Sequence, residues 1–172
     1  IAELPKNEGV IIFTFKTRGT GSSRRASPDF QRLLLDDLRG AGVDVDAKLP
    51  EGDRIVMLTW GQETSLSEYS YCKHVVFAGV LHRDSLQIAS EMIGQMDDLC
   101  GSVSPSKVKD VITSEIAHGL YQAISRGCCR IVDGNQALPM DVWLIHGNDH
   151  IRPSLEQMMP GVQWLEWKPK HL

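Results

Sequence analysis

The residues best suited to chemistry lie together near the middle of the sequence, between positions 121 and 130. Gln122, Arg126 and Arg130 are four residues apart, so on a helix they would occupy one stripe, each about one turn beyond the last. Arginine is a planar, permanently charged partner for phosphate, and two guanidinium groups on one stripe repel each other unless an anion lies near them. Gly127 would fray the helix and let Arg130 turn toward a ligand. The same spacing also fits a pair of surface arginines in ordinary salt bridges, which is the more common arrangement.

A second set of candidates is a short basic segment that follows a run of apolar residues. Four basic residues and no acidic residue occupy positions 16 to 25, namely Lys16, Arg18, Arg24 and Arg25. A loop of this composition after a strand can follow the phosphates of a nucleic acid. A solvated loop without a ligand fits the same residues equally well.

Several well-known catalytic signatures are absent from the sequence. It contains no GxxxxGK[ST] phosphate loop, because the glycine-rich run at 19–23 lacks a lysine, and it contains no GxGxxG, HExxH, CxxC or GxSxG. His146 and His150 are four apart, but Gly147 and Asn148 between them indicate a loop, and two histidines alone make a poor metal site. We therefore expect neither a dinucleotide enzyme nor a bound metal. Trp60 is expected to pack at the end of a strand rather than to stack on a base.

Alternating strands and helices must position these residues. Apolar, β-branched runs predict strands at about 9–16, 54–60, 74–81, 140–146 and 162–167. Helical spacing predicts a helix opened by Ser27 and Pro28 whose apolar face is Phe30, Leu33, Leu34 and Leu38, and further helices at about 85–99, 106–126 and 153–159. This order predicts an α/β fold with a largely parallel, twisted sheet and helices on both faces. Such sheets place their chemistry beyond the carboxyl ends of the strands.

The composition is that of an ordinary globular domain. The chain has 172 residues, 18 Lys and Arg against 22 Asp and Glu, a net charge of −4 and 42% hydrophobic residues. This excludes a disordered chain and a generic nucleic-acid coat protein, and no apolar run is long enough to span a membrane. Four cysteines without a CxxC pattern predict free thiols in a reducing, cytoplasmic setting. We expect one domain over residues 1–172. Because the chain begins at Ile1 rather than Met, we also expect it to be a piece of a longer protein.

Three segments resemble the motifs of one family, in the family's order. Gln-x-x-x-Arg-Gly-x-x-Arg, at residues 122–130, resembles motif VI of superfamily-2 helicases and related nucleic-acid-dependent ATPases. Residues 10–16 resemble motif IV, the first strand of the second RecA-like lobe. Residues 58–64, Leu-Thr-Trp-Gly-Gln-Glu-Thr, with the strand ending at Val80, resemble motif V. The closest likeness is to the phage and plasmid branch of DEAD/DEAH-like helicases, over about residues 9–147.

Two departures from the family pattern affect individual residues. The arginines of the common motif VI are three apart, whereas Arg126 and Arg130 are four apart. The arginine–glycine–hydrophobic–aspartate ending of motif V is absent. The resemblance therefore supports the identity of the lobe more firmly than the role of each residue.

The resemblance implies a RecA-like second lobe that cooperates with an N-terminal RecA-like lobe. ATP and Mg²⁺ would be bound mainly by that first lobe, which carries the phosphate loop and the acid pair, so this chain alone would be inactive. Arg126 would be the arginine finger, Arg130 a second phosphate or interlobe contact, and Gln122 would orient them or the attacking water.

The resemblance also implies a nucleic-acid partner, single-stranded or duplex, with DNA favoured over RNA. Motif V residues would contact its backbone together with the basic segment, namely Thr59, Gly61 and Thr64 with Lys16, Arg18, Arg24 and Arg25. No membrane partner is implied. The alternative function is a non-catalytic α/β module that binds an anionic ligand or a protein.

Overall fold

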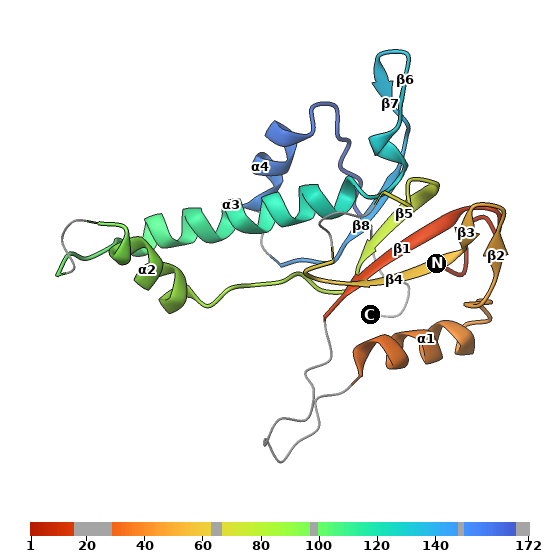
Figure 1. Cartoon of the computed structure of the whole chain (residues 1–172), viewed down its shortest axis with the longest axis horizontal. Coiled ribbons are helices and arrows are strands. Elements are labelled where there is room, and N and C mark those ends of the chain that lie inside the picture. The colour runs from red at the N-terminus through yellow and green to blue at the C-terminus, as the bar shows by residue number, and fades with distance from the viewer. Residues whose placement is uncertain (16–28, 63–66, 97–99, 148–149, 168–172) are drawn as a thin grey trace.

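The centre of the protein is a four-stranded parallel sheet. The computed structural model describes residues 1–15, 29–62, 67–96, 100–147 and 150–167. The strands are β1 (Gly9–Thr14), β4 (Ile55–Thr59), β5 (Cys72–Phe77) and β8 (Asp141–Leu144), in the order β4-β1-β5-β8 (Figure 1). Phe13 of β1 is in register with Leu58 on one side and with Phe77 on the other. The predicted α/β class with a parallel sheet is confirmed.

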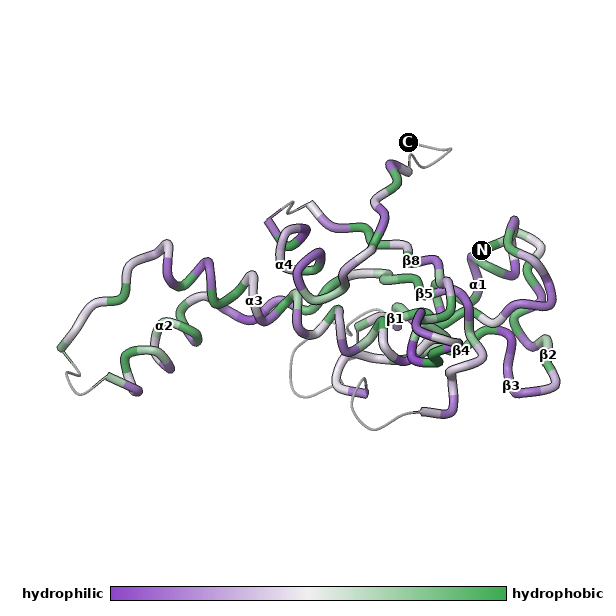
Figure 2. The backbone as a smooth tube through the Cα atoms, turned by 90° about the horizontal axis from the view of Figure 1, so that it is seen from above, coloured by the Kyte–Doolittle hydropathy of each residue, from purple (hydrophilic) through white to green (hydrophobic). Residues whose placement is uncertain are grey.

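Helices cover both faces of this sheet. Helix α1 (Phe30–Gly40) connects β1 to β4 and lies on one face, while α3 (Pro105–Ile124) and α4 (Ile151–Met158) lie on the other (Figure 1). Helix α2 (Ser85–Gly94) packs on α3 and lies beyond the sheet, as both views show (Figures 1 and 2). Because α3 leads from the carboxyl end of β5 back to the start of β8, its own carboxyl end lies at the amino ends of the strands.

Two hydrophobic cores follow from the alternation of side chains along each strand. Ile11, Phe13, Val75 and Phe77 face α3 and α4, where they meet Ile116, Leu120, Ile151 and Leu155. Val10, Ile12 and Ile55 face α1 and meet its Leu38. The four residues of β1 from Val10 to Phe13 are all fully buried, which explains why their run is continuously apolar.

Side-chain caps set where the helices begin. Asp29 accepts a hydrogen bond from the backbone N–H of Arg32 (3.1 Å), and Asp84 accepts one from that of Leu86 (2.8 Å). Ser104 accepts one from the N–H of Lys107, and Pro105 occupies the first position of α3. Each capping oxygen accepts a hydrogen bond from a backbone N–H that has no partner within the helix. Such a cap typically stabilises the folded protein by about 1 kcal/mol.

Several predicted boundaries were wrong. The cap of α1 is Asp29, so the helix begins after the predicted Ser27 and Pro28, which lie outside the described residues. Phe30 and Leu33, predicted in its apolar face, are each 46% exposed, because α1 meets the sheet mainly through Leu38. Helix α2 ends at Gly94 rather than near position 99.

The predicted last strand at 162–167 is irregular chain. Trp164 packs against the core on the α3 face, and the ring of Trp167 contacts that of Trp143 edge to face. These two aromatic contacts hold the segment against the domain without strand pairing, so the apolar pattern that predicted a strand reflects anchoring by single side chains.

Two short hairpins were not predicted. They are β2 (Lys48–Leu49) with β3 (Gly52–Asp53), and β6 (Val132–Asp133) with β7 (Gln136–Ala137). Their turn signals were present in the sequence as Pro50 to Gly52 and as Asp133-Gly134, and Gly134 adopts a φ of 63°.

Candidate functional site

The carboxyl end of α3 is fixed by a close approach of the backbone at Gly127. The helix ends at Ile124, and Gly127 is buried against the amino ends of β5 and β8. A Cβ atom there would lie 3.1 Å from the carbonyl oxygen of Cys72 and would overlap the sulfur of Met140. Only glycine lets the chain cross this edge of the sheet so closely, and this crossing places the residues on either side of Gly127.

The predicted arginine segment is only partly a helical stripe. The side-chain amide nitrogen of Gln122 lies 2.8 Å from Nε2 of His118. Nε of the half-buried Arg126 donates a hydrogen bond to the backbone carbonyl oxygen of Gln122 (3.3 Å). These two residues lie on one side of the helix end, as predicted. Arg130 is exposed and belongs to a separate 3₁₀ turn, Cys128–Arg130. The helix thus ends two residues before the predicted end at about Arg126, and Arg130 lies off the helix, beyond Gly127.

The predicted nucleic-acid contacts lie elsewhere. Thr59 ends β4 and Gly61 follows it with a φ of 99°, so both lie at the carboxyl edge of the sheet, opposite the edge that Gly127 crosses. The amide and the hydroxyl of Thr59 both donate to Oε1 of Gln62, at 2.8 and 2.9 Å. The structure thus does not bring Thr59 and Gly61 close to the predicted arginine segment. The other predicted contacts lie outside the described residues: Lys16, Arg18, Arg24, Arg25 and Thr64.

Trp60 has a structural position. Its ring lies 5.5 Å from that of Phe13 and 5.6 Å from that of Phe77, centroid to centroid, and its Nε1 donates to the carbonyl oxygen of Gly79 (3.1 Å). Its indole ring and its Nε1 therefore both contact other residues of the protein. The prediction that it packs at the end of the sheet is confirmed.

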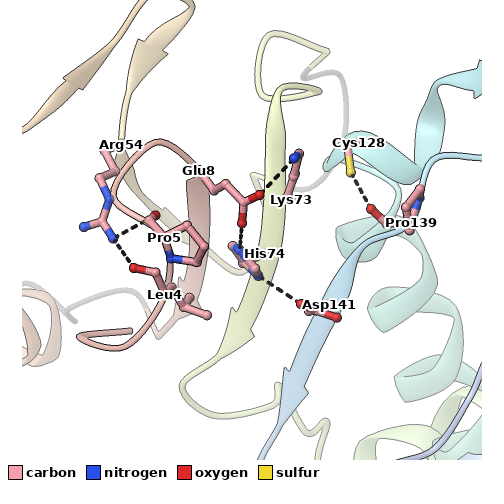
Figure 3. A network of polar contacts seen from close by, with 9 residues as sticks. All are labelled: Leu4, Pro5, Glu8, Arg54, Lys73, His74, Cys128, Pro139 and Asp141. Carbon is pink, nitrogen blue, oxygen red and sulfur yellow. Dashed lines mark hydrogen bonds and ion pairs between the residues drawn. The ribbon is translucent and has the colours of Figure 1, made fainter.

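A polar cluster that the sequence did not reveal lies at the amino edge of the sheet. His74 is 4% exposed, and its Nε2 lies 2.8 Å from Oε2 of Glu8 and its Nδ1 3.4 Å from Oδ2 of Asp141 (Figure 3). Lys73 Nζ donates to the other oxygen of Glu8 (2.9 Å). The two carboxylates face opposite nitrogens of the imidazole ring, so they cannot both bind a metal ion that the ring also ligates. We call these four residues the amino-edge clamp, because they tie β5 to the start of β1 and to β8.

The clamp predicts a pH-dependent contribution to stability. Hydrogen bonds from Lys73 and then from His74 hold the pKa of Glu8 below its ordinary value. A carboxyl whose pKa is lowered on folding stabilises the fold above its unfolded pKa, and this contribution is lost as pH falls through the folded value. We therefore expect Glu8→Gln to be less stable than the parent near neutral pH, and the gap to shrink below about pH 4.

The measurement is denaturant unfolding at a series of pH values. Glu51→Gln is the matched control, because Glu51 is exposed and has no hydrogen bond or ion pair with a described residue. A gap between parent and Glu8→Gln that stays constant with pH would contradict the assignment of Glu8 as a charged clamp.

A pair of histidines lies at the carboxyl edge. The rings of His82, after β5, and His146, after β8, are stacked with centroids 5.2 Å apart. Burial and then the neighbouring His82 lower the pKa of His146. Within the described ranges, no group of three or more His, Cys, Asp and Glu side chains is arranged to hold a metal ion.

The four cysteines, all within the described residues, are free thiols. Burial raises the pKa of Cys72 to about 12, which suppresses the reactive thiolate. Among the helices of the described segments, none combines the length and the apolar character needed to cross a bilayer.

Comparison with protein-family models, with curated proteins and with solved structures found no match to this chain.

Proposed function

We propose that the chain is the second RecA-like lobe of an ATP-dependent nucleic-acid helicase or translocase. One observation carries the proposal: the Gln-x-x-x-Arg-Gly-x-x-Arg segment ends a helix that packs on a parallel sheet, and Gly127 fixes it there by backbone contact. In this role Arg126 stabilises the charge that develops on the γ-phosphate of ATP in the transition state. Arg130 makes a second phosphate or interlobe contact. Gln122 orients Arg126, because the backbone carbonyl oxygen of Gln122 accepts the hydrogen bond of Arg126 Nε.

The two edges of the sheet then have different ligands. The arginine segment lies at the amino edge and would face ATP and Mg²⁺ held mainly by an N-terminal RecA-like lobe. Thr59 and Gly61 lie at the carboxyl edge and would face the backbone of a nucleic acid, with DNA favoured. Arg126 is half-buried, which suits a finger: partial loss of water strengthens its attraction to phosphate without closing access to it.

One observation favours the alternative, a non-catalytic module that binds an anion or a protein. Both polar groups that Thr59 could offer to a nucleic acid already bond to Gln62. A helicase lobe would have to exchange these bonds for contacts to its ligand, whereas a simple binding module would not.

Nucleic-acid-stimulated ATP hydrolysis separates the two functions. The full-length protein that carries this chain and an N-terminal lobe should hydrolyse ATP faster when single-stranded DNA is added. The 172-residue chain alone should show no turnover above background, because its sequence has no phosphate loop. Turnover by the isolated chain would contradict the lobe assignment, and absence of stimulated turnover in the full-length protein would favour the binding module.

A further inference from the structure

The amino-edge clamp and the contact of Gly127 share the same two strand ends. β5 begins at Cys72, and His74 follows two residues later on that strand. β8 begins at Asp141, the register partner of His74, and Met140 precedes it. The carbonyl oxygen of Cys72 and the sulfur of Met140 are among the atoms that a Cβ at Gly127 would meet. The clamp and the crossing of Gly127 therefore depend on the same spacing between β5 and β8.

Residues 126–130, which we call the arginine turn, are attached to this junction. A hydrogen bond fastens the turn to the chain just before β8, since the buried thiol of Cys128 donates to the carbonyl oxygen of Pro139 (3.3 Å; Figure 3). Arg126 and Arg130 lie on either side of the fixed residues Gly127 and Cys128. Because such packed contacts transmit displacement, a change in the gap between β5 and β8 would move both guanidinium groups.

The buried ring of His74 faces a carboxylate at each nitrogen, but only one of these contacts is a hydrogen bond. Nε2 lies 2.8 Å from Oε2 of Glu8. Nδ1 is buried without a hydrogen bond, although Oδ2 of Asp141 faces it at 3.4 Å (Figure 3). A neutral imidazole has a single N–H, so it can donate to only one of the two carboxylates. A second proton would give Nδ1 a hydrogen to donate and would join Asp141 to Glu8 through the ring.

A second proton would also balance the charges around the ring. Glu8, from the segment before β1, and Asp141, from β8, are negative, and Lys73 of β5 supplies one positive charge, bonded to Glu8. Cys128 of the 3₁₀ turn interacts electrostatically with these three groups, but burial raises the pKa of its thiol, which therefore stays uncharged. The side chain of Asp141 is 70% exposed, so a proton can reach Nδ1 of His74 from solvent on that side.

We propose that His74 is a proton-dependent positioning residue for the arginine turn. With both ring nitrogens protonated, it bridges Glu8 and Asp141 and holds β5 and β8 at the spacing that Gly127 requires. With a neutral ring the bond to Asp141 is lost, and the start of β8 is held less firmly. The inference rests on the proposed function only for its consequence, the activity of Arg126. The link between the ring and the turn does not depend on it.

NMR and hydrogen exchange of the 172-residue chain between about pH 5.5 and pH 8.5, the range in which histidines change charge, test that link. The backbone amide signal of Gly127 should shift with the same midpoint as the ring signals of His74. After correction for the intrinsic pH dependence of exchange, the β8 amides should be about fivefold more protected with the ring protonated, because one charge-assisted hydrogen bond to a largely exposed carboxylate is added.

Three variants identify the group responsible. Asp141→Ala removes the acceptor, so the pH dependence of the Gly127 signal and of β8 protection should disappear, with protection at its low value throughout. Asp141→Asn carries an amide that can bond His74 in either protonation state, so protection should stay high throughout. Asp133→Asn is the matched control for loss of charge, because Asp133 is exposed on the β6–β7 hairpin and has no hydrogen bond or ion pair with a described residue. It should behave like the parent.

The same variants of the full-length protein test the consequence for ATP hydrolysis. The kcat of Asp141→Ala should be about fivefold below that of the parent near pH 6 and close to it near pH 8.5, with little change in KM for ATP. Asp141→Asn should match the parent near pH 6. A merely structural loss in Asp141→Ala would instead give a gap that does not change with pH.

The outcomes separate this inference from the proposed function. If the Gly127 signal does not follow the ring of His74, or still follows it in Asp141→Ala, the ring does not position the turn through Asp141, and the inference is overturned while the helicase proposal stands. Equal effects in Asp133→Asn would show a general response to charge and overturn it as well. If the turn follows the ring but the full-length protein shows no stimulated ATP hydrolysis, the inference stands and the proposed function fails.

Discussion

Replacement of Arg126 by alanine in the full-length protein is expected to lower kcat for nucleic-acid-stimulated ATP hydrolysis by about 10³-fold or more, with little change in ATP affinity. A finger acts on charge that develops only in the transition state, so its loss affects turnover rather than ground-state binding. The side chain is placed for such a role by its own helix end: Nε donates to the carbonyl of Gln122, and Gly127 fixes the chain just beyond it.

Steady-state kinetics together with thermal unfolding would test this expectation. Arg126→Lys keeps the charge without the planar fork and should recover only part of the activity. Arg32→Ala removes an exposed arginine from α1, on the other face of the sheet, and should leave kcat unchanged. A large fall in melting temperature of Arg126→Ala would indicate a structural role through the Gln122 bond instead. Near-normal turnover with an intact fold would transfer the role to Arg130 or contradict the helicase proposal.

The fold class could be predicted because the strands are buried on both faces. Val10 to Phe13 must be apolar at every position, since alternate side chains enter two different cores. Which side chains of α1 are buried could not be predicted as reliably. Phe30 and Leu33 satisfy the helical period, but whether the sheet extends far enough to cover them depends on tertiary packing that the local pattern does not contain.

The candidate site was predictable where neighbours in sequence are neighbours in space. Gln122 and Arg126 are one turn apart and do meet, whereas Arg130 ends a 3₁₀ turn whose place depends on the contact of Gly127 with β5. The amino-edge clamp joins Glu8 to a histidine 66 residues away, so no spacing in the sequence indicates it.

Gly79 provides the largest expected effect on stability. It follows β5 with a φ of 107°, and a Cβ atom there would overlap the ring of Phe15, whose Cζ would lie 2.9 Å away. Its carbonyl oxygen also accepts the hydrogen bond of Trp60. We expect Gly79→Ala to lower the free energy of unfolding by about 3 kcal/mol or more, from backbone strain and from displacement of the ring.

Gly61→Ala separates these two causes. Gly61 has a closely similar φ of 99°, but a Cβ atom there would meet nothing within 4 Å, so only the backbone strain remains and a cost of about 1–2 kcal/mol is expected. Denaturant unfolding of both variants measures how much more Gly79→Ala lowers the free energy of unfolding than Gly61→Ala does. Repeating the measurement in a Phe15→Ala background tests whether the ring of Phe15 causes this difference. Without the ring, the cost of Gly79→Ala should fall to about that of Gly61→Ala, because the strained backbone is then the only penalty left. Equal costs in the parent background would mean that the turn after β5 moves away from Phe15 freely, and that the Trp60–Gly79 hydrogen bond does not hold it in place.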